Sequence, residues 1–461
     1  MLKCISPVDG SVYVERPFAD SSEIDSCLAT ASAASQDWKT ISVSQRAELC
    51  SKWVDAFAAK SETIATELAW QMGRPIQYGS GEVRGFEERA RCMIAMAEGV
   101  LQDVELPKRE GFTRFIRRDP LGVVLTVAPW NYPLLTAINS IMPALMAGNA
   151  VILKHSHQTP LCAERMVEAG AEAGFPDGLF QFLHLTREQT AELIRSSEID
   201  GVAFTGSVEG GAEMEKAAAG LFIPVGLELG GKDPAYVRPD ANLAHAIENL
   251  VDGSFFNSGQ SCCGIERIYV HEDLYNGFID GFADLTSQYV LGDPLDASTN
   301  LGPVVRTNAA NFVREQIGEA NASGARGLID TGKFSANAEG TPYLAPQVLV
   351  DVNHSMRVMF EESFGPVVGI MKVSSDDEAI KLMNDSALGL TASIWSADED
   401  AALSIGDRVQ AGTIFMNRCD YLDPELAWTG VKDSGRGVSL SMMGYDQLTQ
   451  AKSFHYRTKI D

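Results

Sequence analysis

The sequence has no grouping of cysteines or histidines that is typical of a metal centre. Its eight cysteines are scattered along 461 residues, without a CxxC pair, and there are only seven histidines. A structural zinc site is therefore not expected, and neither is a small disulfide-bonded scaffold. The opening residues, MLKCISPVDG, also lack the basic and apolar regions of a signal peptide. We therefore expect a cytoplasmic protein whose thiols are mostly small buried hydrophobic groups.

Positive charge is scarce as well. The chain carries 37 Lys and Arg residues against 62 Asp and Glu residues, which gives a formal net charge of −25. Such a charge repels phosphate backbones and anionic membrane surfaces, so we expect neither nucleic acid nor a membrane as a partner. The hydrophobic content of 45% and the charged content of 21% are those of an ordinary globular protein.

One long segment, from Leu121 to Leu153, contains no charged residue and is long enough to span a bilayer. Pro129, Pro133 and Pro143 interrupt it, however, and a lipid-exposed helix tolerates such interruptions poorly. The segment therefore predicts a buried strand, a turn, a buried helix and a second buried strand in a globular core.

The first hundred residues have mainly helical patterns, for example over 44–59 and 82–99, and strands and helices then alternate. Near-continuous β-branched runs are typical of parallel strands that are covered on both faces. The predicted strands of this first unit are 122–130, 149–154, 178–184 and 201–206, with helices near 161–173 and 188–196. A second unit begins after Gly231, with strands near 235–237, 266–270 and 367–372. The pattern predicts a doubly wound α/β architecture.

Two segments with alternating apolar residues lie outside this pattern. GFTRFIRRD, between 106 and 119, predicts a projecting or edge strand. KSFHYRTKI, near the C-terminal end, predicts a strand that pairs either with the first segment or with another subunit.

Four short motifs contain side chains suited to chemistry. FFNSGQSCCGIERIYV, 255–270, places a thiol just after a glycine-containing turn, and a thiolate suits acyl transfer. In PVGLELGGKDP, Glu228 could act as a general base. In APWNYP, Asn131 follows a predicted parallel strand and could donate to a developing oxyanion. The glycine-rich turn FTGSVEGG, 204–211, could hold a pyrophosphate at a helix N-terminus, although its spacing is not GxGxxG.

Taken singly, each motif has a plainer explanation. The cysteines could be an inert buried pair, Glu228 a surface residue at a strand end, and Asn131 a turn former. A fifth motif, EESFGPV at 361–367, alters this balance because all five occur together and in order. The combination of PWN, LELGGK, FxNxGQxC and EExFGPV resembles the aldehyde dehydrogenase superfamily over essentially the full chain.

The resemblance implies an aldehyde dehydrogenase-like α/β fold and the oxidation of an aldehyde to a carboxylic acid with NAD or NADP. Cys262 would attack the aldehyde to form a thiohemiacetal and then a thioester, and Cys263 would be a packing residue or redox partner. Asn131 and the Cys262 backbone N–H would hold the oxyanion, and Glu228 would activate the hydrolytic water. A CoA-acylating enzyme is one alternative, but CoA-acylating members generally lack this glutamate, so Glu228 argues against it. A catalytically silent member of the fold is another, and the presence of Cys262, Glu228 and Asn131 together argues against it.

For the cofactor, the resemblance assigns Trp130 and Lys154 to the adenosine side and Ser207 to the pyrophosphate. Glu362 and Phe364 would contact the nicotinamide ribose. NAD-preferring relatives typically carry Glu three positions after the lysine, where this chain has His157, so we expect NADP to be accepted or preferred. The expected cofactor residues are Trp130, Lys154, Ser156, His157, Gly206, Ser207, Gly211, Glu362 and Phe364.

The resemblance assigns the substrate tunnel to Tyr132, Leu135, Ser261, Leu422 and Trp428. Such walls suit a medium-sized apolar or aromatic aldehyde. The loop that contains Leu422 also carries Asp420, Asp423 and Glu425, which could instead attract a cationic aminoaldehyde. Only Arg418 adds positive charge there, which argues against a semialdehyde with a carboxylate.

By the same resemblance, 1–101 and 121–230 form a Rossmann-type cofactor-binding domain, and 231–447 form an α/β catalytic domain. A small bridging β arm consists of 102–120 and 448–461. Such an arm cannot bury its apolar face alone, so we expect a homodimer or homotetramer.

Overall fold

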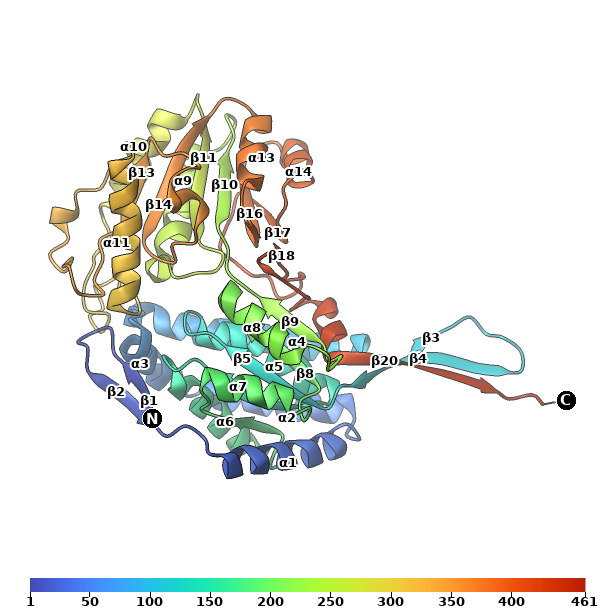
Figure 1. Ribbon diagram of the computed structural model, residues 1–461. Helices are drawn as coiled ribbons and strands as arrows, with labels where there is room; N and C mark the ends of the chain where they lie inside the picture. The colour runs from blue at the N-terminus through green and yellow to red at the C-terminus, as the bar shows by residue number, and fades with distance from the viewer. Residues whose placement is uncertain (461) are drawn as a thin grey trace.

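The computed structural model describes residues 1–460 and consists of two lobes and a projecting arm (Figure 1). The lower lobe in Figure 1 is built on a six-stranded sheet with the order β19-β9-β8-β5-β6-β7. The strands are parallel except β19, which pairs antiparallel with β9. Their bounds are β5 (Val123–Ala128), β6 (Ala150–His155), β7 (Phe180–Phe182), β8 (Gly201–Thr205), β9 (Val225–Glu228) and β19 (Gly435–Arg436).

The uncharged segment that was predicted to be core is the centre of this lobe. β5 and β6 lie side by side in parallel, with Val123 opposite Ala150 and Ala128 opposite His155. The helix between them, α5 (Pro133–Ala147), is buried at every position except Leu135 and packs on β5, β6 and β8. The prediction of strand, turn, helix and strand is therefore confirmed.

Helices surround this sheet. α1 and α6 pack on β6 and β7, while α4, a helix of 25 residues, lies along α5. The helices predicted from periodicity are present as α2, α4, α6 and α7. The helices of the lobe are α1 (Ser21–Trp38), α2 (Val43–Ala58), α3 (Ser61–Met72), α4 (Ile76–Val100), α6 (Pro160–Ala173), α7 (Arg187–Arg195) and α8 (Val208–Ala218).

The upper lobe contains a seven-stranded sheet with the order β12-β13-β14-β11-β10-β16-β17, parallel except at β12. Its strands are β10 (Asp233–Val237), β11 (Ile265–His271), β12 (Arg326–Gly327), β13 (Gln347–Val350), β14 (Val367–Val373), β16 (Thr391–Trp395) and β17 (Thr413–Met416). The flanking helices are α9 (Leu243–Phe255), α10 (Tyr275–Thr286), α11 (Thr307–Ala322), α12 (Arg357–Phe360), α13 (Asp376–Asn384) and α14 (Glu399–Gly406). Both predicted α/β units are thus present.

The arm is an antiparallel ribbon that projects away from both lobes (Figure 1). β4 (Phe112–Pro120) pairs with β20 (Thr449–Arg457) along its whole length, and β3 (Val104–Glu105) adds a short third strand. The rings of Phe115 and Phe454 stack across the ribbon with centroids 4.4 Å apart. The C-terminal strand therefore pairs with the earlier segment of its own chain, which was one of the two predicted alternatives.

Three shorter features complete the fold. β1 (Leu2–Ile5) pairs with β2 (Val12–Arg16), and β15 (Leu388–Gly389) pairs with β18 (Val431–Lys432). After β18 the chain returns to the lower lobe, where β19 extends the first sheet and the 3-10 turn Met442–Leu448 packs on α4 and α5. Among residues 1–460, no helix has the length and hydropathy needed to cross a membrane.

Candidate active site

The segment before Cys262 is a tight turn between α9 and β11. Asn257, Ser258 and Gly259 adopt positive φ angles of 53°, 58° and 71°, a conformation that costs free energy at the two non-glycine positions. Hydrogen bonds hold this backbone in place, and one of them runs from Ser258 Oγ to Gly302 O at 2.8 Å. The turn presents the half-buried Cys262 to a cavity.

A buried ion pair joins this turn to the loop that follows β5. Arg74, only 3% exposed, pairs with Glu82 of α4. Arg74 Nη2 donates to Asn131 O at 2.7 Å, and Arg74 Nε donates to Asn257 Oδ1 at 3.4 Å. Asn257 Nδ2 donates to the same Asn131 carbonyl at 3.1 Å. Burial lowers the pKa of Arg74 to about 10, so the guanidinium stays charged at neutral pH.

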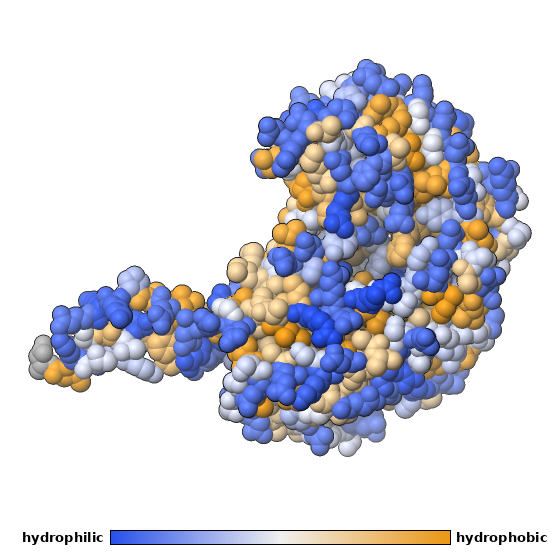
Figure 2. All heavy atoms as spheres, turned by 180° about the vertical axis from the view of Figure 1, so that it is seen from behind, coloured by the Kyte–Doolittle hydropathy of each residue, from blue (hydrophilic) through white to orange (hydrophobic). Residues whose placement is uncertain are grey.

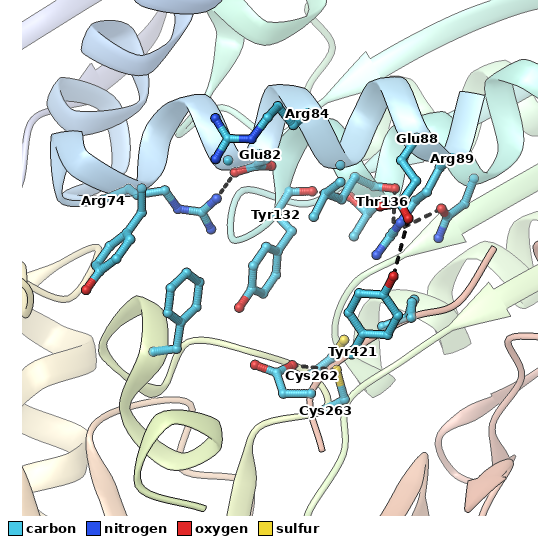
Figure 3. Close-up of a pocket in the computed structure, with 18 of the residues that line it drawn as sticks. Arg74, Glu82, Arg84, Glu88, Arg89, Tyr132, Thr136, Cys262, Cys263 and Tyr421 are labelled. Atoms are coloured by element: carbon cyan, nitrogen blue, oxygen red, sulfur yellow. Dashed lines mark hydrogen bonds and ion pairs between the residues drawn. The ribbon is translucent and has the colours of Figure 1, made fainter. Parts of the chain in front are cut away.

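The Asn131 side chain is buried, and within residues 1–460 its amide has no hydrogen-bond partner. Its Nδ2 is therefore available to donate to a ligand. Asn131 itself does not line the cavity, whereas the next residue, Tyr132, does. Figure 3 shows Tyr132 pointing from the level of Arg74 and Glu82 toward Cys262.

Glu228, at the end of β9, lines the same cavity as Cys262. Its carboxylate accepts a hydrogen bond from the Ser439 hydroxyl, and Asn139 lines the same cavity. Burial raises the pKa of Glu228, while the charge of Arg89 opposes this rise. Arg89 is itself buried, and its Nη1 donates to Asn139 Oδ1 at 3.1 Å. Glu228 is thus a carboxylate that faces the thiol and has a basicity set by its surroundings.

The second cysteine, Cys263, is buried and differs from its neighbour in its partners. Its thiol donates to Asp420 Oδ1 at 2.9 Å, and the Ser261 hydroxyl donates to the same oxygen at 2.9 Å. A hydrogen bond with Cys262 and burial raise the pKa of the Cys263 thiol well above its usual value. Cys263 therefore stays protonated. Both cysteines line the cavity, and Cys262 is the more exposed of the two.

The cavity has a volume of about 500 Å³ and lies between α4, α5, α9 and the 420–428 loop. Of the predicted substrate residues, Tyr132, Leu135, Leu422 and Trp428 line it. Ser261 does not, because its hydroxyl is turned to Asp420.

Several residues of the cavity wall were not predicted from the sequence. Some are charged residues of α4 and of the turn before it, and two lie at the C-terminal end of α9. These residues are Arg74, Arg84, Glu88, Arg89, Asp252 and Phe256. Tyr421 comes from the opposite side, and its hydroxyl donates to Glu88 at 3.3 Å (Figure 3). The expectation that only Arg418 brings positive charge near the substrate was therefore wrong, because α4 is remote in sequence and meets the cavity only through packing.

Trp130, predicted on the adenosine side, contacts Phe364, predicted on the nicotinamide side. Their rings meet edge to face with centroids 5.6 Å apart. Glu362 Oε1 accepts the backbone N–H of Gly231 at 2.9 Å, and burial raises the pKa of Glu362 to about 8. The backbone of Phe364 is held by Glu266, which accepts its N–H at 2.9 Å.

Glu266 forms a second buried ion pair, with Lys232 of the LELGGK motif. It also accepts the backbone N–H of Ser363 at 2.8 Å, and Lys232 Nζ donates to Ser363 Oγ at 3.2 Å. This pair fixes the EESFGPV loop against the strand that follows Cys262.

At the end of β6, His157 contributes no charge. Its Nε2–H donates to Leu185 O at 2.7 Å, and burial and the charge of Lys154 lower its pKa, so the ring is neutral at pH 7. Ser156 Oγ accepts the backbone N–H of Gln158 at 3.2 Å. Burial and the charge of Arg187 lower the pKa of Lys154 to about 8.

The glycine-rich turn opens α8. Ser207 caps this helix by accepting the Gly210 N–H at 3.1 Å, so its hydroxyl has a structural partner. Side chains at the two predicted glycines would collide with neighbours: a Cβ on Gly206 would lie 2.7 Å from the Phe204 ring, and one on Gly211 would lie 2.7 Å from Leu229. The helix N-terminus remains suited to an anion.

The charge of Arg89, which opposes the rise in the pKa of Glu228, gives a test of the expectation that Glu228 is a general base. A general base acts in its ionised form, so an Arg89→Met variant, which removes a positive charge, should shift the acidic limb of the kcat profile to higher pH. Arg89→Lys keeps the charge and should keep the limb near its wild-type position. The measurement is kcat against pH for the three proteins, and an unmoved limb in Arg89→Met would contradict the assignment. Because the methionine leaves the buried Asn139 Oδ1 without its donor, we expect it to cost about 1–3 kcal/mol of stability, to be checked by thermal unfolding.

Comparison with known proteins agrees with this geometry. The profile described as "Aldehyde dehydrogenase family" matches residues 1–454. An aldehyde dehydrogenase of Paenarthrobacter nicotinovorans is 36% identical over 94% of this chain and 94% of its own length. "Succinate-semialdehyde dehydrogenase [NADP(+)] 1" of Mycobacterium bovis is 33% identical over 97% of this chain and 98% of its own.

Solved structures give the same result. An aldehyde dehydrogenase from Brucella melitensis biovar abortus has a TM-score of 0.95 and 26% identity, covering 100% of this chain and 94% of its own. A succinic semialdehyde dehydrogenase from Streptococcus pyogenes in complex with NADP+ has a TM-score of 0.94 and 26% identity, covering 99% and 100%. The predicted fold is confirmed, and the chain belongs to the aldehyde dehydrogenase family.

Proposed function

We propose that this aldehyde dehydrogenase oxidises its aldehyde to the free carboxylic acid by a hydrolytic route and uses NADP. The observation that carries the proposal is that Cys262 and Glu228 line one cavity, with the Asn131 loop fixed beside them by Arg74. A nucleophile and a carboxylate that share one water-accessible space can form a thioester and then cleave it.

In the first half of the reaction, the Cys262 thiolate attacks the carbonyl carbon and forms a thiohemiacetal. The negative charge on its oxygen is stabilised by Asn131 Nδ2 and by the Cys262 backbone N–H. Cys263 takes no direct part, because its proton is held by Asp420. A bound nicotinamide would supply the hydride acceptor that this step needs, and loss of the hydride would leave a thioester on Cys262.

In the second half, Glu228 removes a proton from water, which then attacks the thioester carbonyl. The raised pKa of Glu228 makes it a better proton acceptor than an exposed glutamate. Water adds to the carbonyl, the C–S bond breaks, and the acid leaves while Cys262 is regenerated. A CoA-acylating enzyme would not need this carboxylate, and a silent member would not need the complete set of Cys262, Glu228 and Asn131.

The cofactor fits residues of both lobes. Lys154 and Ser156 would contact the adenosine part of the cofactor. The start of α8 at Ser207 would contact the pyrophosphate, and Glu362 would contact the ribose of the nicotinamide. Hydrophilic residues gather around the hollow between the lobes (Figure 2).

The preference for NADP is supported by the charges near Lys154. No carboxylate stands at position 157, where His157 is neutral and bonded to a backbone carbonyl. Arg187, at the start of α7, is exposed and close enough to lower the pKa of Lys154. Burial and the same Arg187 lower the pKa of Arg306 from the other lobe. A group of mutually repelling cations is a suitable site for a 2′-phosphate.

We further propose the division into a cofactor domain (1–101 and 121–230), a catalytic domain (231–447) and an arm (102–120 and 448–461). The arm exposes one edge of β20 and half-exposed rings such as Tyr456, so we propose that it packs on a second copy in a homodimer or homotetramer. A thiol nucleophile agrees with a cytoplasmic location.

The hydrolytic route makes a kinetic prediction. With an aldehyde, NADP and no CoA, the wild-type protein should turn over continuously. Glu228→Gln should release about one equivalent of NADPH in a burst and then continue roughly 100-fold more slowly, because the thioester persists. Rapid-mixing absorbance at 340 nm measures both phases, and Cys262→Ala should show neither. A wild-type rate that depends on CoA would contradict the hydrolytic assignment.

The cofactor proposal predicts a difference between two arginines of one helix. Arg187→Ala should lower kcat/KM for NADP about tenfold and leave kcat/KM for NAD nearly unchanged, because only NADP carries the 2′-phosphate. Arg195→Ala, at the other end of α7, is the matched control and should change neither. Steady-state kinetics with both cofactors provide the test, and a strong wild-type preference for NAD would refute the proposal.

A further inference from the structure

The cavity is lined by more negatively charged side chains than positively charged ones. Three are guanidinium groups and five are carboxylates: Arg74, Arg84, Arg89, Glu82, Glu88, Glu228, Asp252 and Asp420. The charge of Arg74 is neutralised by its ion pair with Glu82, and the charge of Arg89 offsets that of Glu228. Three carboxylates and one guanidinium remain, so the wall has an excess of negative charge.

Two of the remaining carboxylates, Asp252 and Asp420, line the cavity without an ion pair to any of residues 1–460. Among the described residues, no Lys, Arg or His forms an ion pair with Asp252 or Asp420, and Asp420 is bonded only by the uncharged donors Ser261 and Cys263. Burial raises the pKa of Asp420 to about 6, and the nearby Asp252 adds to the rise. Asp420 is thus ionised at neutral pH, and a positive charge placed between the two would be attracted by both.

Aromatic rings stand beside these carboxylates. Tyr78 and Phe256 both line the cavity, with centroids 5.0 Å apart. Asp252 lines the same cavity, and burial and the charge of Asp252 raise the pKa of Tyr78. The rings of Tyr132 and Tyr421 already carry the guanidinium groups of Arg74 and Arg418, at 4.7 and 3.7 Å from their centroids. Tyr78, Phe256 and Trp428 are the rings of the cavity that pair with no cation of residues 1–460, and of these Tyr78 is the ring whose pKa the charge of Asp252 raises.

An anionic substrate end has weaker support. Arg74 uses its three nitrogens on Glu82, Asn131 and Asn257. Arg89 is bonded to Asn139 and lies beside Glu228. Only Arg84 is left, exposed and bonded to a single hydroxyl at 3.5 Å. An exposed arginine in a cavity wall that has an excess of carboxylates is a poor site for a carboxylate.

We propose that the cavity selects aldehydes that carry a protonated amine or quaternary ammonium group at the end remote from the carbonyl, held by Asp252 and Asp420 and by the rings of Tyr78 and Phe256. This inference rests on the proposed function, since the same cavity holds Cys262. It differs in substrate class from the succinate-semialdehyde dehydrogenases to which the chain is similar.

The test compares cationic aldehydes with neutral molecules of the same shape. The two pairs are 3-aminopropanal with butanal, and 4-(trimethylammonio)butanal with 5,5-dimethylhexanal, with succinate semialdehyde as the anion. We expect kcat/KM for at least one cation to exceed that of its neutral partner about tenfold, and the ratio to fall as NaCl is added.

Asparagine variants identify the groups responsible. Asp252→Asn and Asp420→Asn should each lower the ratio of cationic to neutral kcat/KM by roughly three- to fivefold, and the double variant should bring it near one. Asp252 is exposed, so its variant should fold even if a change at the hydrogen-bonded Asp420 does not. Glu425→Gln is the matched control, because Glu425 lies exposed on the same loop but outside the cavity.

The outcomes separate the two proposals. Oxidation of the neutral aldehydes with no advantage for either cation, or a preference for succinate semialdehyde, would overturn this inference and leave the proposed function intact. A cation preference that Asp252→Asn does not reduce would also overturn it. If the protein oxidises none of the five aldehydes, the proposed function itself fails.

Discussion

The active site depends on one buried ion pair, between Arg74 and Glu82. Taking both charges out of water is costly, and the cost is offset only when hydrogen bonds satisfy the remaining polar atoms. Here Arg74 also donates to Asn131 and Asn257, and Glu82 accepts the Leu134 N–H at 2.9 Å. The pair therefore ties α4 to the loop after β5 and to the turn before Cys262, three segments that are far apart in the chain.

A second buried pair, Lys232 with Glu266, has the same role on the cofactor side. It holds the backbone of Ser363 and Phe364 and thus the loop that contains Glu362. Most polar side chains of the sequence motifs form hydrogen bonds or ion pairs that hold the backbone in position. The groups left for chemistry are few, namely the Cys262 thiol, the Asn131 amide and the Glu228 carboxylate. This division explains why the motifs are longer than the list of reacting groups.

The sequence allowed the sheets to be predicted because their strands are runs of β-branched residues buried on both faces, as in β5 and β6. It also indicated the proposed catalytic set, since Cys262, Glu228 and Asn131 each lie in a contiguous motif. It did not indicate the charged wall of the cavity. Arg89 on α4 and Asp252 on α9 lie on helices with ordinary amphipathic patterns, and only tertiary packing directs them to one space.

Residues near a motif were also misleading in places. Asp423 and Glu425 stand beside Asp420 in the sequence, yet both are exposed outside the cavity. The role expected for Ser207 as a direct cofactor contact competes with its bond to the Gly210 N–H, which a capping serine makes at the start of a helix. Local sequence cannot separate a side chain that caps a helix from one that contacts a ligand, because the same residue types serve both.

The most direct test of the central claim is the activity of an enzyme without the Arg74 pair. Removing both charges in an Arg74→Met, Glu82→Gln double variant avoids leaving one unpaired buried charge. If the pair positions Asn131 for the oxyanion, kcat should fall about 100-fold, while iodoacetamide should still alkylate Cys262 at a nearly wild-type rate because alkylation needs no oxyanion site. A folded double variant that keeps kcat within about twofold of wild type would contradict the account.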